Sequence, residues 1–268
     1  MHTSITDTEF SHFQRFIYEA AGITLSSAKK ALVSGRLAKR LQACELSTYT
    51  DYFKLLSSGE SPAEVQTAVD LLTTNETYFF RESKHFELLQ QVAARPRPGG
   101  QPFRIWSAAC STGEEPYSMA MVLAENLGNA AWEVMASDIS TRVLDRARAA
   151  HFPMERARLI PPAYLKRYCL RGIDTQQGTL LVDRGLRSRV SFMQVNLNTD
   201  LPRLASFDMI FLRNVMIYFN GDTKRQVIAR IVSVLKLGGH LCIGHSESLN
   251  DISTALVQLA PSIYRKPS

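Results

Sequence analysis

A turn of small residues with two carboxylates, SAACSTGEEPYS, is the first segment whose residue types suggest chemistry. It follows a short apolar run and opens a helical pattern, a place where backbone N–H groups can approach a ligand. Gly113 stands alone where dinucleotide-binding motifs carry three glycines, and Glu114 and Glu115 would repel a pyrophosphate. The two acids favour a ligand with positive charge, such as the ammonium and sulfonium of S-adenosylmethionine. Interaction with the helix dipole is their alternative role.

Polar side chains also follow two of the later apolar runs. Asp138 ends the run WEVMASD, 25 residues after Gly113, where nucleotide-binding α/β folds hold ribose hydroxyls. Asn196 and Leu197 follow VSFMQV, and a polar residue beside an apolar one can bind the edge and the face of an adenine. The alternatives are a helix cap at Asp138 and an ordinary exit from strand to loop after VSFMQV.

Two further segments combine polar side chains with aromatic ones. TNETYFFRES lies between the helical first part and the strand-rich second part of the chain, where a cleft between domains would form. FLRNVMIYF includes the end of a predicted strand and the residues just past it. A packed linker and a buried strand end are the alternative interpretations. The candidate residues of both segments are Asn75, Thr77, Arg81, Arg213, Asn214 and Tyr218.

The second part of the chain alternates short apolar runs with helical patterns. Pro116 is expected to open one helix and Gly128 to close it, and Gly238-Gly239 is expected to stop the last helix, with Asp222 as its cap. This alternation predicts a parallel, doubly wound sheet that holds its ligand at the carboxyl ends of the strands. The predicted strands are 103–109, 132–138, 190–196, 207–214 and 240–245.

Two regions depart from this alternation. Before about residue 75, apolar residues such as Phe10, Phe13 and Ile17 recur at helical spacing, which predicts helices without strands. Between about 151 and 190, the segments LIPPAYLKRY and RGIDTQQGTLLVD predict a helix and a short hairpin. We interpret this region as a small insertion on the sheet domain.

Composition narrows the class of protein. The 268 residues are 45% apolar and 21% charged, as in soluble globular proteins. No apolar run reaches the roughly 18 to 20 residues of a membrane-spanning helix, and the start of the chain is unlike a secretory signal. A cytoplasmic protein without membrane insertion is therefore expected. The cysteines are too scattered for a zinc site or a disulfide framework: Cys44, Cys110, Cys169 and Cys242.

The positive charge of the chain is concentrated near its start. The net charge is +6, which favours an acidic partner. The segment KKALVSGRLAKR holds five basic residues and no acidic one, and most of its charges would share a helix face. A solvated face is the alternative. The candidate residues for contact with a partner are Lys29, Arg36, Lys39 and Arg40.

Together, TNETYFFRE, WSAACSTGEEPYSMA, ASDIS, RNVMIYF and GGHLCIGHSES closely resemble, in order, the chemotaxis receptor methyltransferases, the CheR family. The resemblance covers about 74–248, and the helical first part fits as well. It implies a Rossmann-like α/β S-adenosylmethionine-dependent methyltransferase domain, a small all-α N-terminal domain and an inserted β-subdomain. The expected boundaries are 1–73 for the helical receptor-recognition domain, 74–101 for a linker and helix, and 102–268 for the methyltransferase domain, with the insertion at about 151–190.

The resemblance also implies an activity and a set of residues. The expected reaction moves a methyl group from S-adenosylmethionine to glutamate carboxylates of chemoreceptors, giving methyl esters and S-adenosylhomocysteine for sensory adaptation, without a metal. Arg81 and Tyr218 match positions proposed to act at the reacting centre. The segment Glu76-Thr77-Tyr78 departs from many relatives but keeps the matching residues. The implied cofactor-binding residues are Asn75, Thr77, Arg81, Glu115, Asp138, Asn196, Leu197, Arg213 and Asn214.

The chemistry agrees with the absence of a general base in the matched segments. A glutamate carboxylate is ionised at neutral pH, with a pKa of about 4.3, so no proton has to be removed before it attacks a methyl group. The matched segments hold no convincing Ser-His-Asp or Cys-His arrangement, and His245 is at least as well suited to a structural hydrogen bond. Positioning of the reactants is the work left to the enzyme.

The expected partners are the cytoplasmic domains of chemoreceptors, whose acidic methylation helices would meet the basic face. A receptor C-terminal pentapeptide could add a strand to the inserted hairpin. A monomer without nucleic acid is expected. The alternatives are a methyltransferase of another protein or of nucleic acid, and a non-catalytic cofactor-binding signalling module. RNVMIY stands where many nitrogen methyltransferases carry Asn/Asp-Pro-Pro-Tyr, which disfavours that class.

Overall fold

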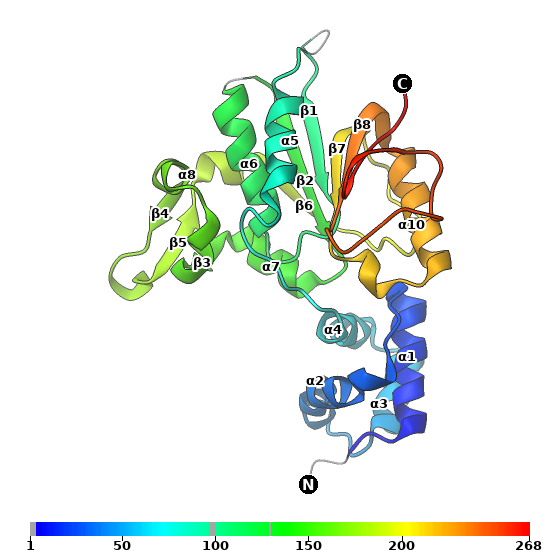
Figure 1. Ribbon diagram of the computed structural model, residues 1–268. Coiled ribbons are helices and arrows are strands. Elements are labelled where there is room, and N and C mark those ends of the chain that lie inside the picture. Colours follow the sequence, from blue (N-terminus) through cyan, green and yellow to red (C-terminus); the bar gives the residue numbers. More distant parts are fainter. Residues whose placement is uncertain (1–3, 97–99, 129) are drawn as a thin grey trace.

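The protein was examined as a computed structural model that describes residues 4–96, 100–128 and 130–268. A helical N-terminal lobe lies below the carboxyl ends of the strands of a larger sheet domain, and a small second sheet projects from the side of that domain (Figure 1). No helix in the described ranges is long and apolar enough to cross a membrane.

The N-terminal lobe consists of four short helices around apolar side chains. Thr6 and Glu9 form a capping box at the first helix, in which Thr6 Oγ1 accepts the Glu9 N–H and the Glu9 carboxylate accepts the Thr6 N–H. Phe13, Ile17 and Leu37 are completely buried between the helices. The helices are α1 (Asp7–Ala21), α2 (Lys30–Ala43, preceded by the short 3-10 helix η1, Ser27–Lys29), α3 (Tyr49–Ser57) and α4 (Pro62–Leu72).

The central sheet has seven strands in the order β6-β2-β1-β7-β8-β10-β9. The first five are parallel to one another, and β10 and β9 extend the sheet as antiparallel strands. This confirms the predicted doubly wound class and adds two C-terminal strands that were not predicted. The strands are β1 (Phe103–Ser107), β2 (Trp132–Asp138), β6 (Val190–Gln194), β7 (Phe207–Leu212), β8 (Leu235–Ile243), β9 (Val257–Ala260) and β10 (Ile263–Arg265).

Helices cover both faces of the sheet, as the apolar strands require. In β7, Met209 and Phe211 belong to the core that contains α5 and α6, whereas Ile210 and Leu212 face the core that contains α10. This alternation follows from the two-residue period of a strand, and it leaves β7 buried on both faces. The helices are α5 (Ser83–Ala93), α6 (Glu114–Leu127), α7 (Thr141–Ala149) and α10 (Gly221–Ser233).

The insertion forms a separate antiparallel sheet of three strands in the order β3-β5-β4, called the inserted sheet below. It follows directly after α7, and the 3-10 helix η3 (Met154–Leu159) and α8 (Pro162–Tyr168) lie between its first two strands in the chain. The 3-10 helix η4 (Asp174–Gln176) and α9 (Arg184–Arg187) complete the region. The strands are β3 (His151–Pro153), β4 (Cys169–Arg171) and β5 (Thr179–Val182).

Three predicted helix ends are wrong, and four of the five predicted strands differ from the observed ones at one end or at both: β1, β6 and β7 end two residues earlier than predicted, and β8 spans Leu235–Ile243 rather than 240–245. Helix α6 begins at Glu114, two residues before the Pro116 that was expected to open it, and Gly113 (φ +100°) is its N-cap. Asn220, not Asp222, caps α10, since its side chain accepts the Thr223 N–H at 2.8 Å. The pair Gly238-Gly239 does not stop α10, which ends at Ser233; both glycines lie inside β8, where pairing with β7 shifts register.

Side chains and backbone join the N-terminal lobe to the sheet domain beside the strand ends. Asp70 of α4 caps α7: its carboxylate accepts the backbone N–H groups of Thr141 (3.1 Å) and Arg142 (3.2 Å) and the Thr141 hydroxyl (2.9 Å). The Thr24 N–H donates to the Tyr218 carbonyl at 2.8 Å. The two parts therefore share polar contacts as well as one continuous apolar core.

Candidate active site

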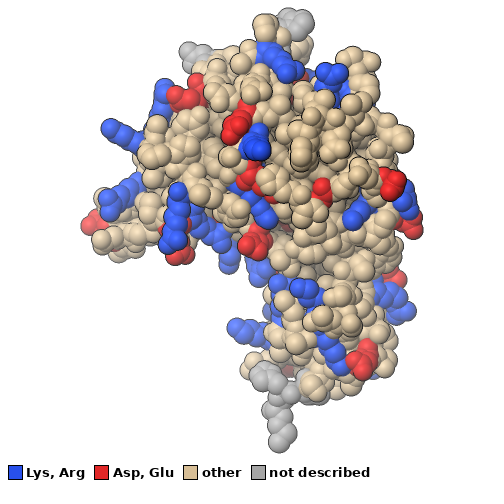
Figure 2. All heavy atoms as spheres, viewed as in Figure 1, with Lys and Arg blue, Asp and Glu red and all other residues tan. Residues whose placement is uncertain are grey.

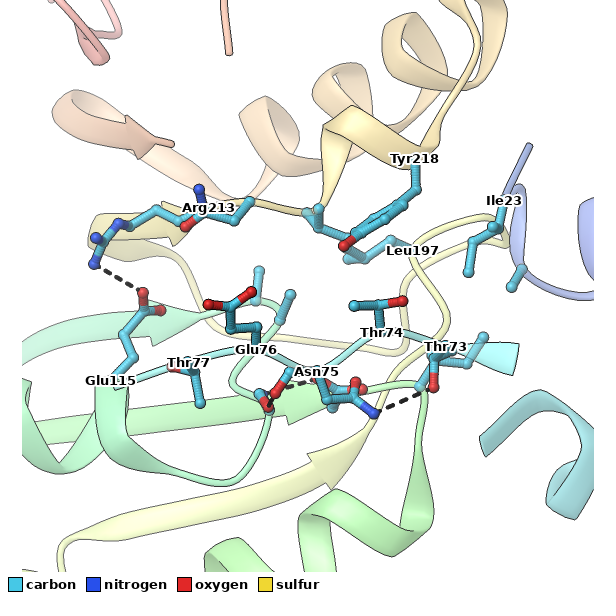
Figure 3. A pocket seen from close by; sticks show the side chains of 18 of the residues that line it. Ile23, Thr73, Thr74, Asn75, Glu76, Thr77, Glu115, Leu197, Arg213 and Tyr218 are labelled. Carbon is cyan, nitrogen blue, oxygen red and sulfur yellow. Dashed lines mark hydrogen bonds and ion pairs between the residues drawn. The ribbon is translucent and has the colours of Figure 1, made fainter. Parts of the chain in front are cut away.

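A cavity with about 810 Å³ of empty volume lies at the carboxyl ends of the parallel strands, where the sheet domain meets the N-terminal lobe. Every residue predicted to bind the cofactor or to act in catalysis lines it. The segment after α4 forms one wall, and the segment after β7, which carries Arg213 and Tyr218, forms the opposite wall (Figure 3). Ala21 and Ile23 bring the end of α1 to the same cavity, so both parts of the protein build it.

A buried acid–base pair closes one end of the cavity. Glu115, the second residue of α6, accepts the Ser107 hydroxyl at 2.6 Å and Nη1 of Arg213 at 3.0 Å. Burial raises the pKa of Glu115, although Arg213 and Ser107 oppose this shift by favouring the carboxylate. Arg213 also pairs with Glu82 at 3.2 Å. Arg213 is thus shared between two carboxylates, and of these Glu115 lines the cavity, where it can meet an ammonium group.

Glu114, the other acid of the turn, points away from this chemistry. It is completely buried, accepts the Thr112 hydroxyl at 2.6 Å and pairs with Arg156 of η3. It does not line the cavity. Its carboxylate thus ties the start of α6 to the insertion, and only Glu115 is available to a ligand.

Asp138 lies at the end of β2 and is held by two backbone N–H groups. One carboxylate oxygen accepts the Ser111 N–H at 2.9 Å and the other accepts the Ser140 N–H at 3.0 Å. Burial raises the pKa of Asp138, with those two hydrogen bonds opposing the shift. Ser140, not Asp138, caps α7 through its own side chain. The carboxylate lines the cavity in a fixed orientation, as a partner of two ribose hydroxyls must.

The amide of Asn196 has a structural use that sequence reasoning did not find. Its Nδ2 donates to the Ala20 carbonyl at the end of α1 at 2.7 Å, and its Oδ1 accepts the Asn198 N–H at 2.9 Å. The side chain therefore fastens the N-terminal lobe to the exit of β6. Leu197, nearly buried, offers the apolar surface for a ring at this end of the cavity, together with Ile139.

The TNETYFFRE segment is fixed from both sides as it crosses the cavity. Arg36 of α2 donates to the carbonyls of Leu72 (3.3 Å) and Thr73 (2.9 Å), and the Asn75 carbonyl accepts the Ser111 hydroxyl at 2.9 Å. The Glu76 carboxylate points into the middle of the cavity (Figure 3). Glu76 thus adds a negative charge between the two ends of the site.

Arg81 and Tyr218 lie on facing walls. The Arg81 guanidinium donates to the Glu76 carbonyl at 3.2 Å and lies 5.4 Å from the centre of the Tyr78 ring. Tyr218 ends the 3-10 helix η5 (Met216–Tyr218), and its hydroxyl points into the cavity toward Thr74 and Glu76 (Figure 3). A phenol and a guanidinium in the lining of one cavity can orient a carboxylate without taking a proton from it.

Comparison with known proteins agrees with this site. Residues 75–263 match the family described as CheR methyltransferase, SAM binding domain, and residues 8–73 match CheR methyltransferase, all-alpha domain. This chain belongs to the CheR methyltransferase family. The predicted cofactor, S-adenosylmethionine, and the class of enzyme, a methyltransferase, are confirmed.

Two relatives of the chain carry the name chemotaxis protein methyltransferase. The one from Klebsiella aerogenes is 42% identical over 97% of this chain and 90% of its own length. The one from Escherichia coli is 40% identical over 97% of this chain and 91% of its own. Among solved structures, the N-methyltransferase NodS from Bradyrhizobium japonicum with S-adenosylhomocysteine matches at 15% identity, with a TM-score of 0.41, over 70% of this chain and 88% of that chain.

The predicted basic face of this CheR-family protein divides into two pairs of residues. Arg40 is bound to the buried Glu64, with Nη2 to Oε2 at 2.6 Å, and Arg36 holds the carbonyls after α4. Lys29 and Lys39 are exposed, with no ion pair to any residue in the described ranges. Only the two lysines are therefore free to meet a partner.

Glu82 was not predicted as a site residue, although it anchors Arg213. It has a left-handed backbone (φ +59°), and its carboxylate accepts the His245 N–H at 3.2 Å. Burial raises the pKa of Glu82, but Arg213 and the contacts of His245 outweigh this and hold the pKa below its ordinary value. The ring of His85 lies beside it, and burial lowers the pKa of His85 to about 4. The backbone of His245 thus has a structural role, because its N–H holds the carboxylate of Glu82.

Proposed function

We propose that this CheR-family protein transfers the methyl group of S-adenosylmethionine to glutamate side chains of chemoreceptors in the cytoplasm, forming methyl esters. The observation that carries this is the arrangement of the cavity: its lining includes an acid for an ammonium, Glu115, an acid for ribose, Asp138, and Arg81, and the Tyr218 hydroxyl points into it (Figure 3). The names of the relatives support the receptor as substrate.

Each residue then has one task. Glu115 binds the ammonium group and Asp138 the ribose hydroxyls, while Leu197 packs against the adenine. When bound, the cofactor supplies a methyl group on a positively charged sulfur. Tyr218 and Arg81 hold the glutamate carboxylate in line with that methyl group, so that a C–O bond forms as the C–S bond breaks. No proton moves, and positioning supplies the rate enhancement, for which well-oriented systems offer up to roughly 7 to 11 kcal/mol.

The decisive test is methyl transfer to a purified chemoreceptor cytoplasmic fragment with radiolabelled S-adenosylmethionine. We expect label to enter the receptor and to leave as volatile methanol after mild alkali, because esters hydrolyse and N-methyl groups do not. Alkali-stable label would assign the protein to nitrogen methylation instead. Cofactor binding without any label on a panel of receptors would contradict the enzymatic function.

The receptor is proposed to dock between the N-terminal lobe and the inserted sheet. Lys and Arg side chains gather along the underside of the sheet domain between these two parts (Figure 2). Helix α7, which carries the exposed arginines Arg146 and Arg148, lies on this underside (Figure 1), and the exposed Lys39 belongs to α2 of the N-terminal lobe. An acidic methylation helix would be attracted to this surface at long range and held by it at contact.

Reversing the two free lysines should weaken receptor binding alone. In Lys29→Glu/Lys39→Glu we expect the Michaelis constant for receptor to rise about fivefold, since exposed charges contribute little each. The dissociation constant for S-adenosylmethionine should stay unchanged. Arg36 and Arg40 are unsuitable for this test because their reversal would break internal contacts. Arg95→Glu, an exposed charge after α5 at the other end of the sheet domain, is the control. Equal effects from both variants would contradict the proposed surface.

The inserted sheet offers an edge for a receptor C-terminal pentapeptide. Strand β4 lies at the open edge of the three-stranded sheet, and Leu170 and Ile173 beside it are 55% and 73% exposed. The opposite edge, β3, ends in Pro153, which has no N–H to donate. We therefore propose β4 as the strand that a peptide extends. The enzyme is proposed to act as a monomer.

A further inference from the structure

The loop after β8 carries a glutamate whose hydrogen bonds all go to backbone N–H groups. Glu247 belongs to GHSES, the one matched segment to which the proposed function gives no role. Its carboxylate accepts the N–H of Gly244 at 2.6 Å in its own loop. It also accepts the N–H of Asn214 at 3.0 Å and of Ile217 at 3.2 Å, in the segment that follows β7.

The backbone around this carboxylate is shaped to receive it. Asn214 has a left-handed backbone, with φ +57°, which turns its N–H toward Glu247. Gly244 makes room, because a Cβ there would lie 2.5 Å from Asn214 Nδ2 and 2.8 Å from Glu247 Oε2. A left-handed asparagine, a glycine without space for a side chain and a partly buried carboxylate therefore form one unit.

The segment that Glu247 holds is the wall of the active site. Between the end of β7 and the start of α10, Arg213, Asn214 and Tyr218 line the cavity, and the only regular structure among them is the three-residue helix η5. Consecutive N–H groups that point the same way form an anion-binding concavity. Without an acceptor, these N–H groups would favour other arrangements of the turn, and Tyr218 would move with them.

We infer that Glu247 is a positioning residue: it fixes the turn 213–218 so that Asn214 and the Tyr218 hydroxyl keep their places in the cavity wall. Glu247 itself does not line the cavity, so it acts through these two residues. The expected effect of Glu247 on turnover, through Tyr218, rests on the proposed function. The expected effect on cofactor affinity, through Asn214, requires only that the protein binds S-adenosylmethionine.

The test uses double-mutant cycles on the full chain. Glu247→Gln keeps the shape but replaces an acceptor oxygen with an NH2 group that faces backbone N–H donors. We expect kcat for receptor methylation to fall about tenfold and the dissociation constant for S-adenosylmethionine to rise about threefold, from losses typical of a few backbone hydrogen bonds. When Glu247→Gln is added to Tyr218→Phe, kcat should fall little further than in Tyr218→Phe alone. When it is added to Asn214→Ala, the affinity for S-adenosylmethionine should fall little further than in Asn214→Ala alone. In each double mutant, the group that Glu247 positions has already been removed.

If Glu247 only stabilised the fold, the fold-loss in kcat or affinity caused by Glu247→Gln would be the same in the wild-type protein as in Tyr218→Phe or Asn214→Ala. This result would overturn the inference. So would unchanged kcat and affinity in Glu247→Gln. Glu87→Gln, an exposed change on α5, is the control. Should Glu247→Gln fail to fold, Glu247→Asp carries both cycles, since it keeps the charge but shortens the reach. Wild-type protein that binds cofactor but forms no receptor ester would contradict the proposed function, and the Asn214 cycle would still decide the role of Glu247.

Discussion

Replacing Tyr218 with phenylalanine should lower kcat for receptor methylation about 100-fold, the cost of removing one preorganised hydrogen-bond donor from a reacting centre. The hydroxyl points into the middle of the cavity, between the end formed by Glu115 and the end formed by Asp138. The ring would remain, so the apolar wall of the cavity would be preserved. The dissociation constant for S-adenosylmethionine should therefore stay within about threefold of the wild-type value, since we propose that Tyr218 contacts the carboxylate of the substrate and not the cofactor.

Single-turnover rates and calorimetric binding of the cofactor would separate these two effects. Tyr164→Phe is a matched control, because Tyr164 lies in α8 of the insertion, outside the residues that line the cavity. An unchanged turnover, or a loss of cofactor affinity as large as the loss of rate, would show that Tyr218 does not orient the reactants.

Replacing Glu115 with glutamine should raise the dissociation constant for S-adenosylmethionine about 100-fold, or about 2.7 kcal/mol. The carboxylate is held in place by Ser107 and Arg213, and it is the acid available to a ligand at that end of the cavity. A glutamine would lose the charge-assisted bond to an ammonium and would leave Arg213 with Glu82 as its remaining carboxylate partner. S-adenosylhomocysteine carries the same ammonium, so its affinity should fall equally.

The pH dependence of binding checks the same assignment. Burial raises the pKa of Glu115, so its protonation on acidification begins at a higher pH than for an ordinary glutamate. A protonated Glu115 cannot attract an ammonium, and the affinity of the wild-type protein should fall as the pH is lowered from neutral. In Glu115→Gln the loss of affinity on acidification should be smaller, because only the protonation of Asp138, whose pKa is also raised by burial, would then contribute to it. An identical pH dependence in both proteins would rule out Glu115 as the ammonium ligand.

Local patterns were sufficient to predict the five parallel strands of the sheet and the end of these strands at which the cavity lies. Strand β2 spans Trp132–Asp138, the segment predicted, because the mostly buried apolar residues 134–136 are followed by the polar Ser137 and Asp138, where the strand ends. The topology rule that parallel strands present their carboxyl ends together then brings Glu115, Asp138 and Arg213 to one cavity, although 98 residues separate the first from the last.

Contacts between distant segments could not be predicted in this way. On α2, Val33, Leu37 and Leu41 point inward, and Arg36 and Arg40 flank that apolar stripe rather than face away from it. Arg40 reaches Glu64, 24 residues away, and Asn196 reaches Ala20, 176 residues away. Neither contact produces a repeating pattern in the sequence, because each one joins a single pair of residues. The roles of Glu82 and Glu247 were missed for the same reason.

The cap that Asp70 places on α7 limits how freely this protein can be recombined. A chimera that exchanged residues 1–73 for the equivalent helices of a relative, in order to redirect it to other receptors, would also exchange the acid on which Thr141 and Arg142 rest. Three residues before Thr141 lies Asp138. A mismatched graft would thus disturb the ribose end of the cavity while appearing to alter only specificity. A graft of the N-terminal lobe should therefore preserve cofactor affinity only if it keeps both Asp70 and the residues of α7 that Asp70 contacts.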